Sequence, residues 1–245
     1  MLSILYQDEH LVAVDKPSGL LVHRTGLDAG ETRFALQLVR DQLGRAVWPV
    51  HRLDKGTSGV LLFALNVETA RALGKSFEAG IGLDKTYNAI VRGWAPEAGL
   101  IDHALRRMPD DMRIEREEIQ EARTRFRTLE HLVLPLAQGN FPTTRCSLVE
   151  AAPLTGRRHQ LRRHLKHIAH PIIGDATHGK GPLNRALADH IGVQRLWLHA
   201  RSLSLVHPVT GQTVVIEAEP DASWGRWMAY RTDAAIRAAA SESAQ

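Results

Sequence analysis

The sequence predicts an α+β domain built on a mixed, largely antiparallel β-sheet, and three features of the chain lead to this prediction. Strand and helix signals alternate along the chain without an internal repeat. Strands that are adjacent in sequence are mostly joined by hairpin turns, which favours antiparallel pairing. A chain of 245 residues with 44% hydrophobic and 24% charged residues can also bury a large core without disulfides. One domain is expected to account for most of the chain.

The first half of the chain is expected to form strands separated by two amphipathic helices. Asn66 is a typical helix N-cap, and Gly44 and Gly80 are typical of residues that end a helix. In chain order, we expect two short strands within 2–22 around a turn at Asp8–His10, a helix at 32–44, a strand at 60–65, a helix at 66–79 and a strand at 83–94.

The second half is expected to add the remaining strands, three further helices and an exposed insertion. In chain order, these are the polar insertion at 106–122, strands at 123–134 and 143–151, a helix after 157 that Pro171 ends, a short helix at 183–191, a hairpin with its turn at Pro208–Gln212, and an Ala/Arg-rich helix at 221–240. We therefore divide the chain into a domain at 1–220 and a C-terminal helix with a polar tail at 221–245.

Composition restricts the compartment and the partners. The single cysteine, Cys146, cannot form an internal disulfide, which favours a reducing compartment. Charged residues interrupt the first 22 residues, so no signal-peptide core is expected, and no apolar run is long enough to span a membrane. We expect a soluble, cytoplasmic monomer without a membrane partner.

Basic residues are concentrated in one segment of the chain, which has a formal net charge of +4. Residues 157–166 (RRHQLRRHLK) include five Arg or Lys and no acid, whereas 115–121 (EREEIQE) is mostly acidic. A basic run of this kind is either a solvated helix face or a surface for a polyanion such as RNA.

Residues 50–60 (VHRLDKGTSGV) place one carboxylate, Asp54, among basic side chains just before an apolar strand. Asp54 either caps an ordinary turn or is a reactive group fixed at the edge of the sheet. Neighbouring arginines would lower the pKa of this carboxyl and keep it ionised, which suits a nucleophile better than a general acid.

The basic segment also predicts a helix with distinct faces. Leu161 and Leu165 lie on one helical stripe, Arg163 and Lys166 point away from it, and Arg162 lies on its flank. His164 points toward the apolar stripe, which favours a packed imidazole over a zinc ligand, and no zinc, phosphate-loop or serine-hydrolase motif occurs. The residues alone indicate no more than an enzyme acting on RNA or a phosphate-containing substrate.

Five segments resemble the motifs of the RluA-type pseudouridine synthases, in the order in which that family has them. These are ILYQDEHLVAVDKPSGLLVH, HRLDKGTSGVLLFAL, KTYNAIVRG, TGRRHQLRRHL followed by HPIIGD, and LWLHARSLSLVHPVTG, which together span 2–216. The resemblance implies a pseudouridine synthase fold with a central active-site cleft and no cofactor. Within the family, residues 142–175 are most similar to the members that modify uridine 65 in the T-stem of tRNA.

The resemblance also implies a role for each catalytic residue. Asp54 would be the catalytic aspartate, attacking C6 or C1′ of a uridine or removing a proton at C2′. Arg162 would be the ion-pair partner of Asp54. Tyr87 would stack on the uracil and help to remove the C5 proton, although a phenol with a pKa near 10 needs a tuned site for that role.

The remaining family positions concern RNA binding and base flipping. Arg52 would fill the space that an extruded uridine leaves, His51 would shape the loop, and Thr57–Gly59 would form the turn that orients Asp54. We expect phosphate contacts from the basic residues Arg157, Arg158, Arg163 and Lys166. No separate N-terminal S4 domain is expected, so the catalytic domain would bind RNA by itself.

Three alternatives to a tRNA-modifying synthase remain. One is an enzyme of the same family that acts on ribosomal RNA or on another tRNA position. The second is a non-catalytic RNA-binding protein that keeps the fold, against which the intact Asp54, Tyr87 and Arg162 set argues. The third is a metal-dependent hydrolase that uses the histidine cluster.

Overall fold

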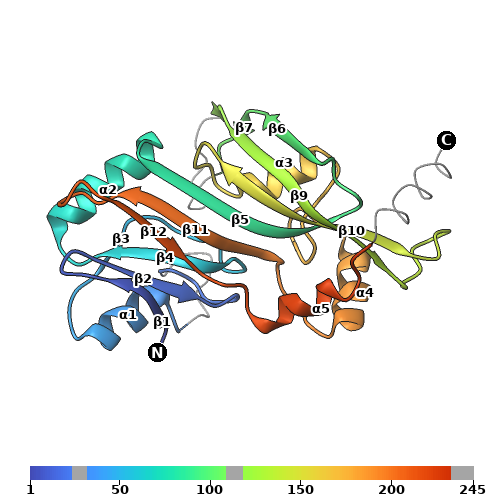
Figure 1. Ribbon diagram of the computed structural model, residues 1–245, viewed down its shortest axis with the longest axis horizontal. Coiled ribbons are helices and arrows are strands. Elements are labelled where there is room, and N and C mark those ends of the chain that lie inside the picture. The colour runs from blue at the N-terminus through green and yellow to red at the C-terminus, as the bar shows by residue number, and fades with distance from the viewer. Residues whose placement is uncertain (24–31, 109–117, 233–245) are drawn as a thin grey trace.

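The computed structural model describes residues 1–23, 32–108 and 118–232, whose strands form one large sheet and one small one (Figure 1). The strands of the large sheet are β1 (Ser3–Gln7), β2 (Leu11–Lys16), β3 (Trp48–Pro49), β4 (Ser58–Ala64), β5 (Leu83–Arg92), β6 (Ala98–Asp102), β9 (Arg123–Leu134), β10 (Thr144–Pro153), β11 (Leu198–Val206) and β12 (Thr213–Glu217). The helices are α1 (Ala35–Leu43), α2 (Val67–Ala79), α3 (Gln160–His167), α4 (Gly181–Ile191), the 3₁₀ helix η1 (Ala222–Trp224) and α5 (Gly225–Met228).

The large sheet is mixed and mostly antiparallel, which confirms the predicted α+β class. Its ten strands follow the order β1-β2-β4-β11-β5-β10-β9-β6, with β3 paired to β4 and β12 paired to β11. The pair β4–β11 is parallel, and the other pairs are antiparallel. In Figure 1, α1 and α2 lie beside the β1–β4 part of the sheet, whereas α3 and α4 lie toward β9 and β10.

Local side-chain chemistry places many elements where the sequence predicts them. The Asn66 side chain accepts a hydrogen bond from the Thr69 N–H at 2.8 Å and starts α2, and Gly80 ends that helix in the left-handed conformation. Gly44 ends α1 in the same way. The predicted hairpin is also confirmed, because β11 pairs antiparallel with β12.

The helix α3 is shorter than predicted at both ends. It begins at Gln160, so Arg157 and Arg158 belong to the preceding loop. It ends at His167 and not at Pro171, because Ala169 takes a left-handed conformation with φ +66°. The His170 N–H then donates to the Leu165 carbonyl at 2.9 Å and closes the last turn.

Two other segments also differ from the sequence prediction. The ends of the predicted insertion at 106–122 are ordered as a two-stranded sheet of β7 (Leu105–Arg106) and β8 (Ile119–Gln120), and 109–117 lie outside the described residues. Within 221–232, the described part of the predicted helix at 221–240, the chain forms η1 and α5, and Arg231 then forms a β-bridge with Leu132. The rest of that predicted helix lies in 233–245, outside the described residues. The division of the chain at residue 220 stays a prediction.

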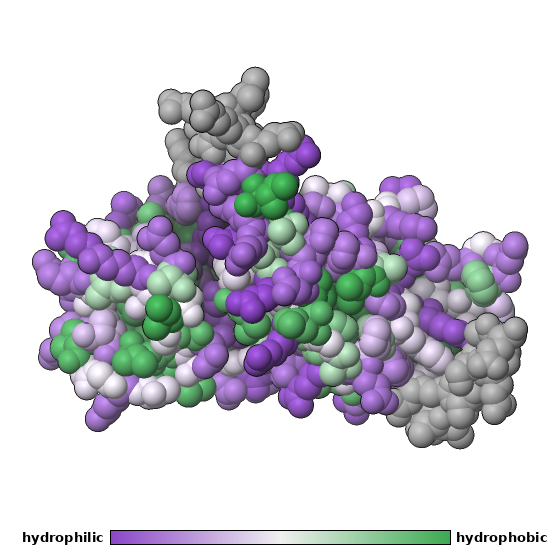
Figure 2. Space-filling model, turned by 90° about the horizontal axis from the view of Figure 1, so that it is seen from above, coloured by the Kyte–Doolittle hydropathy of each residue, from purple (hydrophilic) through white to green (hydrophobic). Residues whose placement is uncertain are grey.

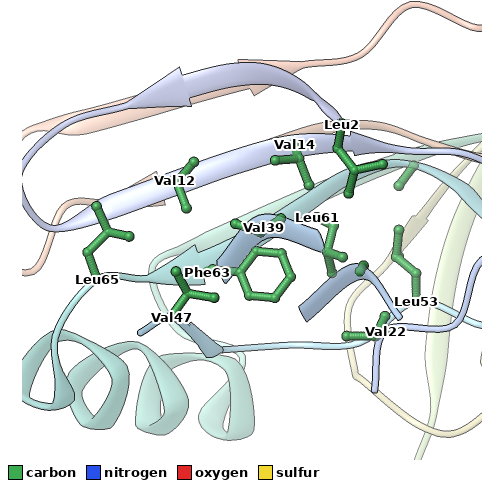
Figure 3. Packing of buried hydrophobic residues seen from close by; sticks show 12 residues of the cluster. Leu2, Val12, Val14, Val22, Val39, Val47, Leu53, Leu61, Phe63 and Leu65 are labelled. Carbon is green, nitrogen blue, oxygen red and sulfur yellow. The ribbon is translucent and has the colours of Figure 1, made fainter. Parts of the chain in front are cut away.

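The core beside the candidate site is built around β4, every residue of which is buried. Leu61 and Phe63 face one way and pack with Val39 of α1, as Figure 3 shows, while Leu62 packs on the other face with Leu73 of α2. Burial of one such side chain contributes about 1.5–3 kcal/mol. Because side chains pack on both faces of β4, the strand is held firmly, and the loop that precedes it ends at a fixed position.

In the face shown in Figure 2, hydrophilic side chains predominate and hydrophobic ones form smaller groups between them. Among the described residues, no helix combines the length and the apolar character that a membrane span requires.

Candidate functional site

Asp54 begins a tight turn between the buried Leu53 and strand β4. The Thr57 N–H donates to the Asp54 carbonyl oxygen at 3.0 Å, so the turn comprises residues 54–57. The prediction that Ser58 and Gly59 belong to this turn is wrong, because both residues are already part of β4.

Gly59 is required by the pairing of β4 with β11. Its φ is +105°, and a Cβ at this position would lie 2.2 Å from the Ala200 carbonyl oxygen. In the sheet register, Ala200 stands opposite Gly59 on one side and opposite Tyr87 of β5 on the other. Gly59 at the start of β4 and Tyr87 of β5 therefore lie at the same level of the sheet, on either side of β11.

Residues of the Lys16–Gly19 stretch hold the Asp54 turn by hydrogen bonds to its backbone. The fully buried Lys16 ammonium donates to three backbone carbonyl oxygens, one of which is that of Lys55 at 3.2 Å. The Ser18 hydroxyl donates to the Gly56 carbonyl oxygen at 2.7 Å. Burial lowers the pKa of Lys16 to about 7, against the opposing effect of the Asp54 charge.

Arg162 bridges two carboxylates. Its Nη1 donates to Asp54 Oδ2 at 3.0 Å, while Nε and Nη2 donate to the two oxygens of Asp175 at 2.7 and 2.8 Å. The side chain of Asp175 is fully buried and also accepts from the N–H groups of Thr177 and His178. Burial acts to raise the pKa of Asp175, but these donors outweigh it and hold the pKa below its usual value. The predicted ion pair of Arg162 with Asp54 is thus present.

His159 is a further neighbour of the Asp54 carboxylate. Its Nε2 lies 3.7 Å from Asp54 Oδ1, and its Nδ1 lies 3.2 Å from His178 Nε2. Burial lowers the pKa of His159 to about 4, although the Asp54 charge acts in the opposite direction, so the ring is neutral at pH 7. The backbone of His159 has φ +55°, a left-handed conformation that non-glycine residues adopt only rarely.

Tyr87 packs between two hydrophobic clusters and faces the same pocket as Asp54. Burial raises the pKa of Tyr87 above its usual value of 10, and the nearby Asp54 charge raises it further. The phenol is therefore neutral at physiological pH in the free protein. This shift runs against a role as proton acceptor and leaves stacking as the simpler role.

Asp54, Tyr87, His159 and Arg162 line one pocket of about 440 Å³, a volume typical of small-ligand sites. It lies over β5 and β11 in the middle of the sheet. The predicted site residues that line it are His51, Arg52, Asp54, Tyr87, Arg157, Arg158 and Arg162.

Arg163 and Lys166 lie away from the pocket lining. Arg163 Nη1 donates to the Arg106 carbonyl oxygen at 2.9 Å and so ties α3 to the small sheet. Lys166 is exposed on the outer face of α3. Arg157 lines the pocket, and its Nε donates to the Glu121 carbonyl oxygen at 3.0 Å. The predicted phosphate-binding residues therefore divide into a pocket pair and an outer pair.

His51 has a structural role in the loop. Its Nε2 accepts a hydrogen bond from the Leu62 N–H at 3.0 Å, and its ring stacks on Phe77 with centroids 4.8 Å apart. Burial lowers the pKa of His51 to about 3, and the charge of Lys85 lowers it further. A neutral His51 therefore joins the loop to β4 and α2, as predicted for a residue that shapes the loop.

His164 is a packed histidine, as predicted. Its Nδ1 lies 2.9 Å from Thr124 Oγ1 and its Nε2 lies 2.9 Å from the His103 carbonyl oxygen. Both ring nitrogens are thus engaged with the protein, and the residue is fully buried.

Sequence reasoning missed Asp175, His159 and Lys85. Asp175 ends the HPIIGD segment and His159 lies in the TGRRHQ segment, so both motifs were recognised but not these residues. Lys85 lies two residues before Tyr87 and lines the same pocket. Only the spatial arrangement shows that these three side chains belong to the site.

Comparison with known proteins agrees with this geometry. The family model described as RNA pseudouridylate synthase matches residues 10–167, more than half of the chain, and the match includes Asp54, Tyr87 and Arg162. A relative from Vibrio cholerae, named tRNA pseudouridine synthase C, is 50% identical over 228 residues, which cover 91% of this chain and 93% of the relative. A relative of the same name from Yersinia pestis is also 50% identical, with 91% and 88% covered.

Solved structures show the same fold. Human RNA Pseudouridylate Synthase Domain Containing 1 superposes with a TM-score of 0.72 at 28% identity, covering 95% of this chain and 89% of that one. Human RNA Pseudouridylate Synthase Domain Containing 4 gives a TM-score of 0.68 at 26% identity, with 92% and 93% covered.

Proposed function

The chain belongs to the RNA pseudouridylate synthase family, and we propose that it converts uridine 65 in the T-stem of tRNA to pseudouridine. The observation that supports this most is the Asp54–Arg162 ion pair, which faces Tyr87 across one pocket. The choice of tRNA rests on relatives that are about half identical and are named tRNA pseudouridine synthase C. The choice of position 65 rests on the resemblance of residues 142–175.

The reaction is an isomerisation, so the site must hold a detached base without a redox partner. The glycosidic bond between N1 and C1′ breaks, the uracil turns within the site, and a bond between C5 and C1′ forms. The proton lost from C5 balances the proton that N1 gains. A pocket that keeps the uracil in place between these steps is therefore the main requirement.

Asp54 supplies the carboxylate, and Arg162 orients it. The guanidinium is itself fixed by two hydrogen bonds to the buried Asp175, so it cannot turn away from Asp54. One oxygen of Asp54 is engaged by Arg162 at 3.0 Å, while 22% of the side chain stays exposed to the pocket. The carboxylate can then attack C6 or C1′, or accept the proton at C2′, from a defined direction.

Tyr87 provides a flat surface for the uracil, since it is held between two hydrophobic clusters. A role in removing the C5 proton would require its raised pKa to fall during the reaction. If Asp54 forms a covalent adduct, its charge disappears, and one of the two causes of the raised pKa disappears with it. Burial, the larger cause, remains.

A uridine in a stem must leave the helix before it can reach this pocket, at a cost of a few kcal/mol. Arg52 is exposed and lies beside Asp54 in the pocket lining, a suitable position for occupying the vacated space. Arg157 and Arg158 approach from the opposite loop and can hold the flanking phosphates. We further propose that the enzyme acts as a monomer in the cytoplasm, where tRNA is found.

Chemical mapping of pseudouridine in cellular RNA, with and without this gene, tests the proposal. The expected result is loss of pseudouridine at position 65 of tRNA alone. Loss at another tRNA position or in ribosomal RNA would replace the proposed target but retain the chemistry. No loss at any position, together with intact RNA binding, would favour the non-catalytic RNA-binding alternative.

A further inference from the structure

Lys85 is a cation in the candidate pocket that the catalytic scheme does not use. It lies on β5 two residues before Tyr87, so both side chains point to the same face of the strand, and both line the pocket. The residue is half-buried. Among the residues that the structure describes, none forms a hydrogen bond or an ion pair with the Lys85 ammonium.

The Lys85 ammonium lies near Phe77 and Gly156, and close enough to the His51 ring for its charge to lower the pKa of that ring. Lys85 Nζ lies 5.8 Å from the centroid of the Phe77 ring, and it would lie 3.9 Å from a Cβ on Gly156. Gly156 immediately precedes the two pocket-lining arginines, Arg157 and Arg158. The ammonium therefore lies between α2 and the loop that carries Arg157 and Arg158.

The other charged groups of the pocket do not neutralise Lys85. Asp54 is paired with Arg162, and Glu78, the other carboxylate in the lining, forms no ion pair with Lys85. Burial lowers the pKa of Lys85 because the ammonium loses water without gaining an anion. A partly buried cation without a counter-charge is unfavourable, and an anionic ligand would relieve that cost.

We propose that Lys85 binds a backbone phosphate next to the flipped uridine. The proposal rests on the proposed function, because the anion is taken to be a phosphodiester of the RNA substrate. A lysine ammonium is a compact point charge that suits a phosphate oxygen. Since Lys85 and Tyr87 are about 6.7 Å apart along the strand, a base stacked on Tyr87 leaves Lys85 available for its own phosphate.

A protein–RNA double-mutant cycle tests this contact. The RNA is a T-stem hairpin with uridine 65, carrying either normal linkages or one uncharged methylphosphonate 5′ or 3′ of that uridine. The proteins are the Asp54→Asn parent, which should not turn the RNA over, and the same parent with Lys85→Met. Lys75→Met in that parent is the matched control, because Lys75 is exposed on α2 and lies outside the pocket lining.

Lys85→Met should weaken binding of the unmodified RNA about 10- to 100-fold, the range for a hydrogen bond to a charged group. One of the two methylphosphonates should weaken binding by the parent equally and produce little further loss with Lys85→Met. Lys75→Met should bind like the parent. Additive losses at both linkages, or unchanged affinity after Lys85→Met, would overturn the contact.

Two further measurements distinguish loss of a phosphate contact from loss of packing and from failure of the proposed function. A lower melting temperature for Lys85→Met with additive RNA effects would assign Lys85 to packing against Phe77 and overturn the proposal. The wild-type enzyme is assayed for pseudouridine on the unmodified hairpin in parallel. Absence of product there would count against the proposed function, whereas the binding cycle would still decide the Lys85 contact.

Discussion

Replacement of Asp175 by Asn should destabilise the protein and slow the reaction, although Asp175 does not line the pocket. Its side chain is fully buried, and that of its partner Arg162 is 9% exposed. Loss of one member of a buried ion pair costs about 3–5 kcal/mol, since the other charge is left buried. Because Asp54 still neutralises part of the Arg162 charge, we expect the lower limit of about 3 kcal/mol.

Thermal unfolding measures the structural part of this prediction. For a domain of this size, about 3 kcal/mol corresponds to a decrease in melting temperature of roughly 6–12 °C. The matched control is Glu150→Gln, which breaks the Arg127–Glu150 pair on the exposed surface. That variant should melt like the wild type, because exposed ion pairs contribute little to stability.

The stability difference between wild type and Asp175→Asn should also depend on pH. The folded protein holds the pKa of Asp175 below the usual 3.8, so its contribution is fully present above that value. As the pH falls through the folded pKa, Asp175 becomes protonated and the difference between the two proteins should shrink. A difference that stays constant down to strongly acidic pH would contradict the assigned ionisation.

Single-turnover kinetics measure the functional part. Asn at position 175 leaves Arg162 one acceptor oxygen in place of two and no charge partner there. Arg162 can then turn away from Asp54, and the rate should fall at least tenfold, about 1.4 kcal/mol in the barrier. RNA affinity should change little, since Asp175 is buried. A variant that melts with the wild type and turns over at the wild-type rate would refute the positioning role of Asp175.

Three other changes test neighbouring parts of the site. Arg52→Ala should slow a tRNA-stem substrate far more than an unstructured oligonucleotide of the same local sequence, by up to the few kcal/mol that unstacking costs; equal losses would exclude a flipping role. Arg157→Ala should lower the salt slope of RNA binding by about one, whereas Lys166→Ala should do so less because Lys166 lies away from the pocket; the reverse order would move the RNA path onto α3. Gly59→Ala should lower both the melting temperature and turnover, because its Cβ would clash with Ala200; wild-type values for both would show that the approach of β4 to β11 is not restrictive.

Local signals were sufficient to predict most elements of the fold. Asn66 and Gly80 determine the limits of α2 through hydrogen bonds and backbone conformation within one turn of the chain. The end of α3 was not predictable from Pro171, because the left-handed Ala169 stops the helix first and carries no glycine-like signal. Trp224 and Trp227 are buried against Trp197, and an Ala/Arg pattern gave no sign of this packing.

Site residues that lie at known positions of a family motif were predictable from the sequence. Contacts between residues of distant segments were not. Asp54, Tyr87 and Arg162 came from the family resemblance, and the structure brings all three to one pocket. Asp175 becomes recognisable as the second partner of Arg162 only through its burial and its hydrogen bonds. The turn after Asp54 was placed two residues too late, because the conformation of Gly59 is set by its contact with β11.

The most direct test of the central claim is the single-turnover rate of Asp54→Asn on a tRNA T-stem with uridine 65. The amide keeps the shape of the side chain but loses the nucleophile and the charge that pairs with Arg162. We expect no detectable pseudouridine, with melting temperature and RNA affinity close to those of the wild type. A rate within about tenfold of wild type, a barrier change of only ~1.4 kcal/mol, would show that Asp54 is not the catalytic aspartate.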